Sequence, residues 1–265
     1  MQETSGRIHS RHLRNRRTVW LCPPQAPSLP CPLIVFLDGE LYRDRVGANA
    51  IVDRLRKQGR LGDAWLVFVS ARTVKIRARE CPCHRPFARF VAAELLPWLE
   101  RRHPEIRLAT ARVLVGLSYT GLAAAYVAIT HPRLFDKVVC QSGSFWWRSC
   151  WLPRNYASRK TVTKAAFFLD VGRKETEENV RHSIGVLQKA SQIEGVRRFS
   201  DALRRKGNDV RYLEFDGGHE CAAWAETLPT ALQWALASSP PDPKRTPAFL
   251  RPEASGAAAG REQIK

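Results

Sequence analysis

The sequence predicts one α/β domain with a mostly parallel, doubly wound sheet and helices on both faces. Short apolar runs alternate along the chain with longer amphipathic stretches, which is the pattern of strands and their covering helices. The apolar runs are continuous rather than alternating, as is typical of strands buried on both faces. A chain of 265 residues, 44% of them hydrophobic, is enough for one large core. We expect the domain to span residues 1–238, and the Pro-, Ala- and charge-rich residues 239–265 to form a disordered tail.

Each strand is expected where a short β-branched or aromatic run meets turn residues. The run 33–37, Leu-Ile-Val-Phe-Leu, stops at Asp38-Gly39, and the run 113–115 stops at Gly116. In chain order the expected strands are 18–21, 33–37, 65–70, 113–115, 137–141, 165–171 and 210–215. The stretches between and after them predict helices at 46–58, 86–101, 121–131, 179–206 and 222–237.

The chain is strongly basic, with a formal net charge of +18 carried mainly by arginine. These arginines are spread along the chain, whereas a nucleic-acid reader usually concentrates basic residues with aromatics on one element. The charge therefore indicates either an ordinary arginine-rich surface or attraction of an anionic substrate, and it does not favour nucleic acid as a partner.

The cysteines and the apolar runs indicate in which cellular compartment the protein is expected. Seven cysteines, an odd number, are scattered along the chain, which suits reduced thiols better than a disulfide framework. No apolar run approaches the ~18 residues that cross a bilayer, and the first residues lack the apolar region of a signal peptide. The sequence therefore predicts a cytoplasmic protein with no membrane partner.

Residues 111–125 have the form of a strand–turn–helix elbow, which presents a serine at the end of a strand. The strand stops at Gly116, Ser118 follows two residues later, and small residues of a tightly packed helix come next. A serine needs such a position, and a base, to act as a nucleophile. Thr120 occupies the position of the second glycine in the usual Gly-x-Ser-x-Gly pattern, where a β-branched residue would crowd the helix start. Alone, the segment fits an ordinary turn with Ser118 as a helix cap equally well.

Other strand ends supply partners for Ser118, because ligands bind beyond the carboxyl ends of the strands in this architecture. The amides of Glu40, after Asp38-Gly39, and of Tyr119 are expected to form an oxyanion hole, unless Asp38-Gly39 is a simple turn. His219 follows a late strand in a loop with two glycines, where a general base is needed.

The acid that orients His219 is expected just past the strand 165–171. Glu175 is the favoured residue, and Asp170, inside that strand, is its rival. The chain order Ser118, Glu175, His219 is nucleophile, acid and histidine, the order found in α/β-hydrolases.

On these residues, the chain resembles the putative esterase family of α/β-hydrolases, particularly its enterochelin-esterase-like branch, from about residue 17 to 234. The resemblance implies a single α/β-hydrolase domain that hydrolyses carboxylic esters, with Ser118 as nucleophile, His219 as base and Glu175 as acid. Members of this branch hydrolyse the trilactone of catecholate siderophores. The family usually has two glycines where this chain has Thr120-Gly121. The matching stretches are Leu37-Asp38-Gly39-Glu40, Arg77-Ala78-Arg79-Glu80, Glu94-Leu95-Leu96-Pro97-Trp98, Gly116-Leu117-Ser118, Gln141-Ser142-Gly143-Ser144-Phe145-Trp146-Trp147, Gly172-Arg173-Lys174-Glu175 and Gly217-Gly218-His219 with Trp224.

Arg77 and Trp146 are the candidates for substrate binding. Arg77, expected in the loop after the strand 65–70, would either bind an anionic substrate or form a salt bridge to Glu80 or the surface. Trp146 follows a strand end and would either line the pocket or pack in the core.

One stretch of the chain contains residue types that bind metals. The run Cys81-Pro82-Cys83-His84 suggests metal ligands, but no second ligand pair follows at a matching distance. We therefore expect neither a metal nor an organic cofactor.

The sequence thus predicts a serine esterase that forms an acyl-enzyme on a small ester, with an anionic or catecholate siderophore ester as the candidate substrate. Two alternatives stay open: an acyltransferase of the same fold, and a catalytically dead hydrolase scaffold with a basic binding surface. The oligomeric state is not indicated.

Overall fold

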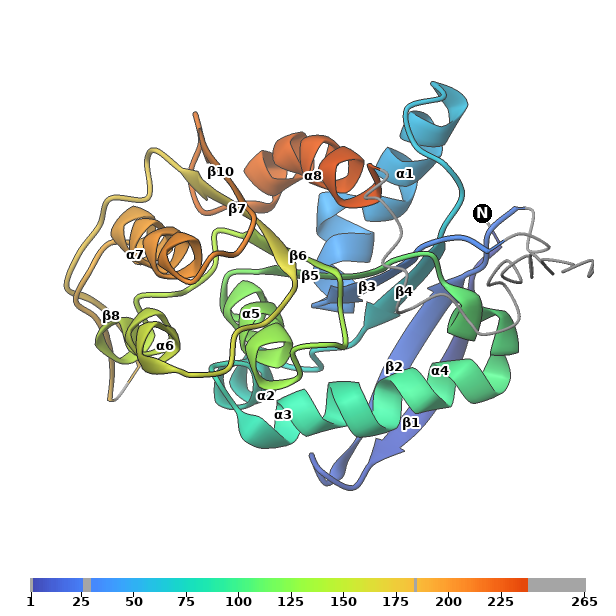
Figure 1. Cartoon of the computed structure of the whole chain (residues 1–265), viewed down its shortest axis with the longest axis horizontal. Helices are drawn as coiled ribbons and strands as arrows, with labels where there is room; N and C mark the ends of the chain where they lie inside the picture. Colours follow the sequence, from blue (N-terminus) through green and yellow to red (C-terminus); the bar gives the residue numbers. More distant parts are fainter. Residues whose placement is uncertain (1, 26–29, 184, 238–265) are drawn as a thin grey trace, which may run out of the picture.

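An eight-stranded sheet runs through the protein and carries helices on both faces (Figure 1). The computed structural model describes residues 2–25, 30–183 and 185–237, so the tail expected at 239–265 lies outside the described residues. The strand order is β1-β2-β4-β3-β5-β6-β7-β10. β1 and β2 pair antiparallel, β2 pairs antiparallel with β4, and the other neighbours are parallel. The predicted α/β class and mostly parallel sheet are confirmed.

The strands of this sheet are β1 Thr4–Ser10, β2 Asn15–Cys22, β3 Leu33–Leu37, β4 Trp65–Val69, β5 Arg112–Leu117, β6 Lys137–Gln141, β7 Ala166–Gly172 and β10 Val210–Phe215, and a separate hairpin pairs β8 Val180–Ser183 with β9 Val186–Gln188. The helices are α1 Ala48–Lys57, α2 Val74–Glu80, α3 Arg85–Arg89, α4 Leu96–Arg102, α5 Tyr119–Thr130, α6 Trp147–Ser158, α7 Gln192–Arg205 and α8 Cys221–Leu236. Short helical turns lie at η1 Leu41–Val46, η2 Phe90–Leu95 and η3 Pro104–Leu108.

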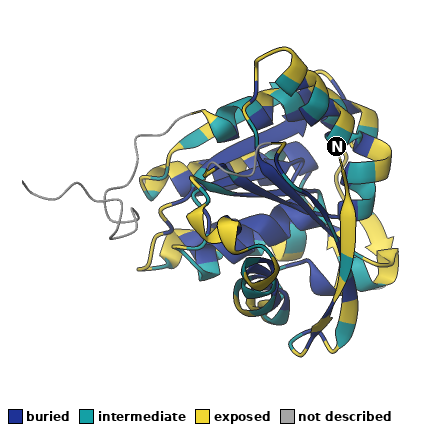
Figure 2. Cartoon of the chain, turned by 90° about the vertical axis from the view of Figure 1, so that its right-hand side faces the viewer, coloured by how far each residue is buried: buried dark blue, intermediate teal, exposed yellow. Residues whose placement is uncertain are grey.

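The central strands are buried because helices cover both of their faces. β3, β4 and β6 are buried at every position, as continuous apolar runs predict. One core lies under η1, α1 and α8, and the other under α3, α4, α5 and α7 (Figure 1). Figure 2 shows the buried strands enclosed by helices whose outer surfaces are exposed. Among the described residues, no helix is both long enough and apolar enough to cross a membrane.

Several elements differ from those expected. The single helix expected at 179–206 is wrong, because the hairpin β8–β9 occupies its first part and α7 begins only after Ser191. The Ser191 side chain accepts a hydrogen bond from the amide of Glu194 and so caps α7. β1, α2 and α6 were not expected. One face of β1 is exposed and polar, so its sequence lacks the apolar run that revealed the central strands.

The parallel strands bring the chain's chemistry to one edge of the sheet. The carboxyl ends of β3, β5, β6, β7 and β10 lie side by side there. The residues that leave these ends include Glu40, Ser118, Ser142, Glu175 and His219. This edge is the candidate active site.

Candidate active site

Ser118 lies in a strained turn between β5 and α5. Its backbone angles, φ 52° and ψ −120°, are ones that a side-chain-bearing residue rarely adopts. The turn is tight enough that a Cβ at position 116 would lie 2.2 Å from the carbonyl oxygen of Thr120, so only glycine fits there. The backbone of β5 and α5 thereby holds the Ser118 hydroxyl beyond the end of the sheet.

Thr120 does not crowd the helix start, and the expectation that it would is wrong. Its side chain is buried, and its hydroxyl oxygen accepts a hydrogen bond from the amide of Leu117 at 3.0 Å. The hydroxyl also lies 2.8 Å from Oδ2 of Asp38, to which it donates. Thr120 therefore ties the elbow to the loop after β3.

Ser118, His219 and Glu175 form a connected row of side chains. Nε2 of His219 lies 3.0 Å from Oγ of Ser118, and Nδ1 of His219 lies 2.6 Å from Oε2 of Glu175. The His219 side chain is 41% exposed, whereas that of Glu175 is 2% exposed. A ligand can therefore reach the serine and the imidazole, while the carboxylate is held out of water.

Two further groups fix the Glu175 carboxylate from behind. Its Oε1 accepts hydrogen bonds from the Ser142 hydroxyl at 2.6 Å and from the amide of Gly172 at 2.8 Å. The Ser142 hydroxyl in turn accepts from Nε1 of Trp224 at 3.0 Å. The sequence did not predict this contact. Ser142 and Trp224 both belong to the stretches that resemble the esterase family, and that resemblance was the one signal that pointed to them.

Asp170, the rival acid, lies elsewhere. It is a buried residue of β7, and its Oδ1 accepts a hydrogen bond from the amide of Ser142 at 3.0 Å. Burial raises the pKa of Asp170 to about 7. The geometry thus pairs His219 with the loop carboxylate of Glu175 and leaves Asp170 supporting the loop after β6.

The backbone amides of Glu40 and Tyr119 lie at the starts of two helical segments. Tyr119 is the first residue of α5, and Glu40 immediately precedes η1. Amides in a first helical turn have no acceptor within their own helix. Gly39 is required beside them, because a Cβ there would lie 2.9 Å from the amide nitrogen of Val69.

Arg77 lies in α2 rather than in the expected loop. Its guanidinium contacts the Asp38 carboxylate, with Nη2 and Oδ2 2.6 Å apart, and Nη2 also donates to the carbonyl of Leu117 at 3.2 Å. Its salt bridge is therefore to Asp38, whereas Glu80 contacts Arg17 and Arg79. In this position Arg77 holds the β3 loop against the elbow.

Trp146 is only 2% exposed. Its ring stacks on His182 at a centroid distance of 4.8 Å, and its Nε1 donates to Oε1 of Gln192 at 2.5 Å. These contacts favour the core alternative for Trp146. His182 belongs to β8, not to the helix that the sequence predicted there.

The cysteine run after α2 gives no sign of a ligand set. Burial raises the pKa of Cys81 to about 12, which keeps its thiol protonated. Within the described ranges, no group of three or more His, Cys, Asp or Glu side chains could hold a metal ion.

Residues 10–235 match the family model described as Putative esterase. The chain belongs to this family. Over 239 residues it is 29% identical to the iron(III) enterobactin esterase of Dickeya dadantii, covering 88% of this chain and 54% of that protein. Over 220 residues it is 28% identical to the iron(III) enterobactin esterase of Escherichia coli K12, covering 81% of this chain and 52% of that protein.

Solved structures show the same fold. The enterobactin esterase of Shigella flexneri superposes with a TM-score of 0.76 at 24% identity, over 89% of this chain and 59% of that one. These relatives place the chain in the enterochelin-esterase-like branch of the family. The chain spans about half the length of these two curated relatives.

Proposed function

We propose that the protein is a serine esterase that hydrolyses carboxylic esters through an acyl-enzyme. The observation that carries the proposal is the connected row from Glu175 through His219 to Ser118, with the serine on a strained elbow. Membership in the esterase family supports the same chemistry.

In the first step, Nε2 of His219 accepts the proton of the Ser118 hydroxyl as Oγ attacks the ester carbonyl. Glu175 accepts a hydrogen bond from Nδ1 and stabilises the imidazolium that forms. The amides of Tyr119 and Glu40 donate to the developing oxyanion. His219 then gives its proton to the departing alcohol. In the second step, His219 takes a proton from water as the water oxygen attacks the acyl carbon. His219 then returns this proton to Oγ of Ser118 as the bond between Oγ and the acyl carbon breaks and the acid leaves.

For the substrate, we propose an ester of a siderophore, anionic or catecholate in character. The support comes from the relatives described as enterobactin esterases, together with the net charge of +18, which attracts anions. We place the reaction in the cytoplasm, which the seven free thiols favour.

The first prediction tests the nucleophile. Ser118→Ala should lower kcat for ester hydrolysis by about 10⁴-fold or more, because the covalent route is lost, and should abolish labelling by a fluorophosphonate probe. The measurement uses a panel of activated esters that includes an iron-loaded catecholate trilactone, with circular dichroism to confirm folding. Wild-type protein that neither reacts with the probe nor cleaves any ester would favour the dead-scaffold alternative, and transfer to an added alcohol in preference to water would indicate the acyltransferase.

A further inference from the structure

A basic pocket lies beside the end of β4. It has a volume of about 380 Å³, within the range of small-molecule sites. Its walls come from the β1–β2 hairpin and from the turn that follows β4. The lining residues are Arg7, Arg16, Arg17, Thr18, Ser70, Arg72 and Thr73.

Only one of the four arginines in this pocket is neutralised. Arg17 is buried and forms a salt bridge with Glu80. Arg7, Arg16 and Arg72 are exposed, and none of them forms an ion pair with any residue that the structure describes. Their positive charges are therefore available to a ligand.

The pairing of the strands brings these charges together. Arg7 pairs with Thr18, and His9 with Arg16, so Arg7 and Arg16 project from the same face of the hairpin. Arg72, in the turn after β4, lines the same pocket. Three arginines that form no ion pair with any described residue thus line one concavity, an arrangement that favours an anion.

The pocket also adjoins the proposed oxyanion hole. The Glu40 carboxylate accepts hydrogen bonds from the Ser70 hydroxyl and from the amide of Ala71, so the turn after β4 is fixed to the residue whose amide would bind the oxyanion. β4, β2 and β1 are the second, third and fourth strands from β5, so the pocket lies roughly 10–20 Å from the end of β5. A substrate long enough to span this distance can therefore reach both Ser118 and the pocket.

We propose that this pocket binds an anionic, oxygen-rich group of the ester substrate, at a point roughly 10–20 Å from the reacting carbonyl. The inference rests on the proposed esterase function and extends it to a substrate subsite. Carboxylate or catecholate oxygens are suited to guanidinium forks, which can bind two oxygens at once. Arg77, which the sequence had suggested for this role, is already paired with Asp38.

The test compares two substrates on two charge-matched variants. One substrate is the p-nitrophenyl half-ester of a long dicarboxylic acid, and the other ends in a primary amide instead of the free carboxylate. The pocket variant carries Arg7→Gln, Arg16→Gln and Arg72→Gln. The control variant carries Arg107→Gln, Arg204→Gln and Arg205→Gln, and so loses the same net charge.

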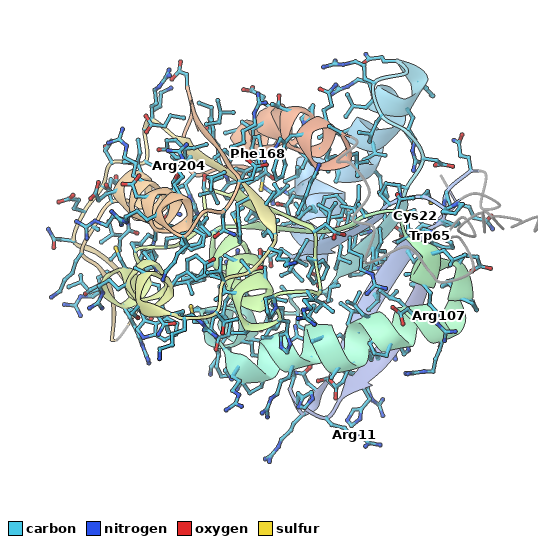
Figure 3. The ribbon with its side chains drawn as sticks, in the orientation of Figure 1. Arg11, Cys22, Trp65, Arg107, Phe168 and Arg204 are labelled. Carbon is cyan, nitrogen blue, oxygen red and sulfur yellow. The ribbon has the colours of Figure 1, made fainter. Side chains whose placement is uncertain are left out.

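None of the control arginines lines the pocket. Arg107 precedes β5 and Arg204 and Arg205 precede β10, so all three lie toward the amino ends of the strands, opposite the candidate site. Figure 3 shows Arg107 and Arg204 in separate regions of the molecule. All three control arginines are exposed.

We expect the pocket variant to lose about tenfold in kcat/KM for the carboxylate substrate and less than twofold for the amide substrate. The control variant should change little on either. Equal losses in both variants would assign the preference to overall charge, and an unchanged preference in a folded pocket variant would refute the subsite; both outcomes leave the esterase proposal standing. If wild-type protein cleaves neither substrate in a Ser118-dependent way, it is the esterase proposal that fails.

Discussion

At the scale of single residues, the Glu175 carboxylate is held by more than its histidine partner. Its Oε1 is occupied by Ser142 and by the amide of Gly172, which leaves Oε2 to face His219. The Ser142 hydroxyl is itself oriented by Trp224, because it accepts the indole N–H and must donate elsewhere. In the proposed mechanism, Ser142 is therefore a positioning residue for Glu175.

Ser142→Ala should lower kcat by about tenfold with little change in KM, because Glu175 loses a charge-assisted hydrogen bond and His219 loses its fixed orientation. Steady-state kinetics on one activated ester measures both constants. Ser200→Ala is the matched control, since Ser200 is equally buried and its hydroxyl has no hydrogen-bond partner among the described residues. A fall in kcat as large in the control as in Ser142→Ala would count against the positioning role.

The raised pKa of Asp170 predicts how the stability of the protein depends on pH. Burial raises its pKa to about 7, whereas an unfolded Asp titrates near about 3.9. Between these two pH values Asp170 is protonated in the folded protein and ionised in the unfolded chain. The free energy of unfolding therefore falls as the pH rises from about 4 to about 7. Asp170→Asn cannot ionise, and its stability relative to wild type should be greater at pH 8 than at pH 5, by roughly 2 kcal/mol.

Denaturant unfolding at the two pH values measures this difference. Asp201→Asn, exposed on α7, serves as the control and should change the free energy of unfolding equally at both pH values.

Activity distinguishes Glu175 from Asp170. Glu175→Gln should slow hydrolysis more than Asp170→Asn, since Glu175 contacts His219 and Asp170 does not. The opposite ranking in folded variants would transfer the role to Asp170.

At the scale of elements, the loops after β7 and β10 depend on each other. The first carries Glu175 and the second carries His219. They approach so closely that a Cβ on Gly172 would lie 2.3 Å from the carbonyl oxygen of Gly217. Gly218, one residue further, has open space around the position of a Cβ. Gly217 therefore contacts the loop after β7, whereas Gly218 has no such close neighbour.

Gly172→Ala should therefore separate the two loops and lower kcat/KM by about tenfold or more, with a loss of thermal stability, because backbone atoms must move. Gly218→Ala should stay within about twofold of wild type in kcat/KM. Kinetics and thermal melting of the two variants provide the comparison. Similar behaviour of both alanine variants would show that the loop contact does not position the histidine.

The sequence revealed the strands that carry a short apolar run bounded by turn residues. β3, β4 and β6 are buried at every position and were placed within one residue of their observed bounds. The candidate site followed from β5, β7 and β10, since Ser118, Glu175 and His219 each follow the end of one of these predicted strands. β1 escaped because its polar exposed face breaks the apolar run. The contacts of Ser142, Thr120 and Arg77 escaped because they join segments distant in sequence, where spacing carries no information.

At the scale of the whole molecule, the excess of positive charge destabilises the folded state. The net charge of +18 is that of a single chain of 265 residues, and like charges on the surface repel one another. Raising the NaCl concentration from about 0.05 M to about 0.5 M should therefore raise the melting temperature, because it screens this repulsion. Thermal scans in NaCl test this, with an equal osmolality of a neutral solute as control. A melting temperature that falls with salt would mean that attractive ion pairs dominate.

The order of the strands has a consequence for folding. Ser118 and His219 are 101 residues apart in sequence, and His219 follows β10, an edge strand that, among the described residues, pairs only with β7. An edge strand can detach while the rest of the sheet stays paired. We therefore expect covalent labelling of Ser118 by an active-site probe to require that β10 is docked on β7. During gradual unfolding in denaturant, this labelling should be lost before the circular dichroism signal of the folded protein.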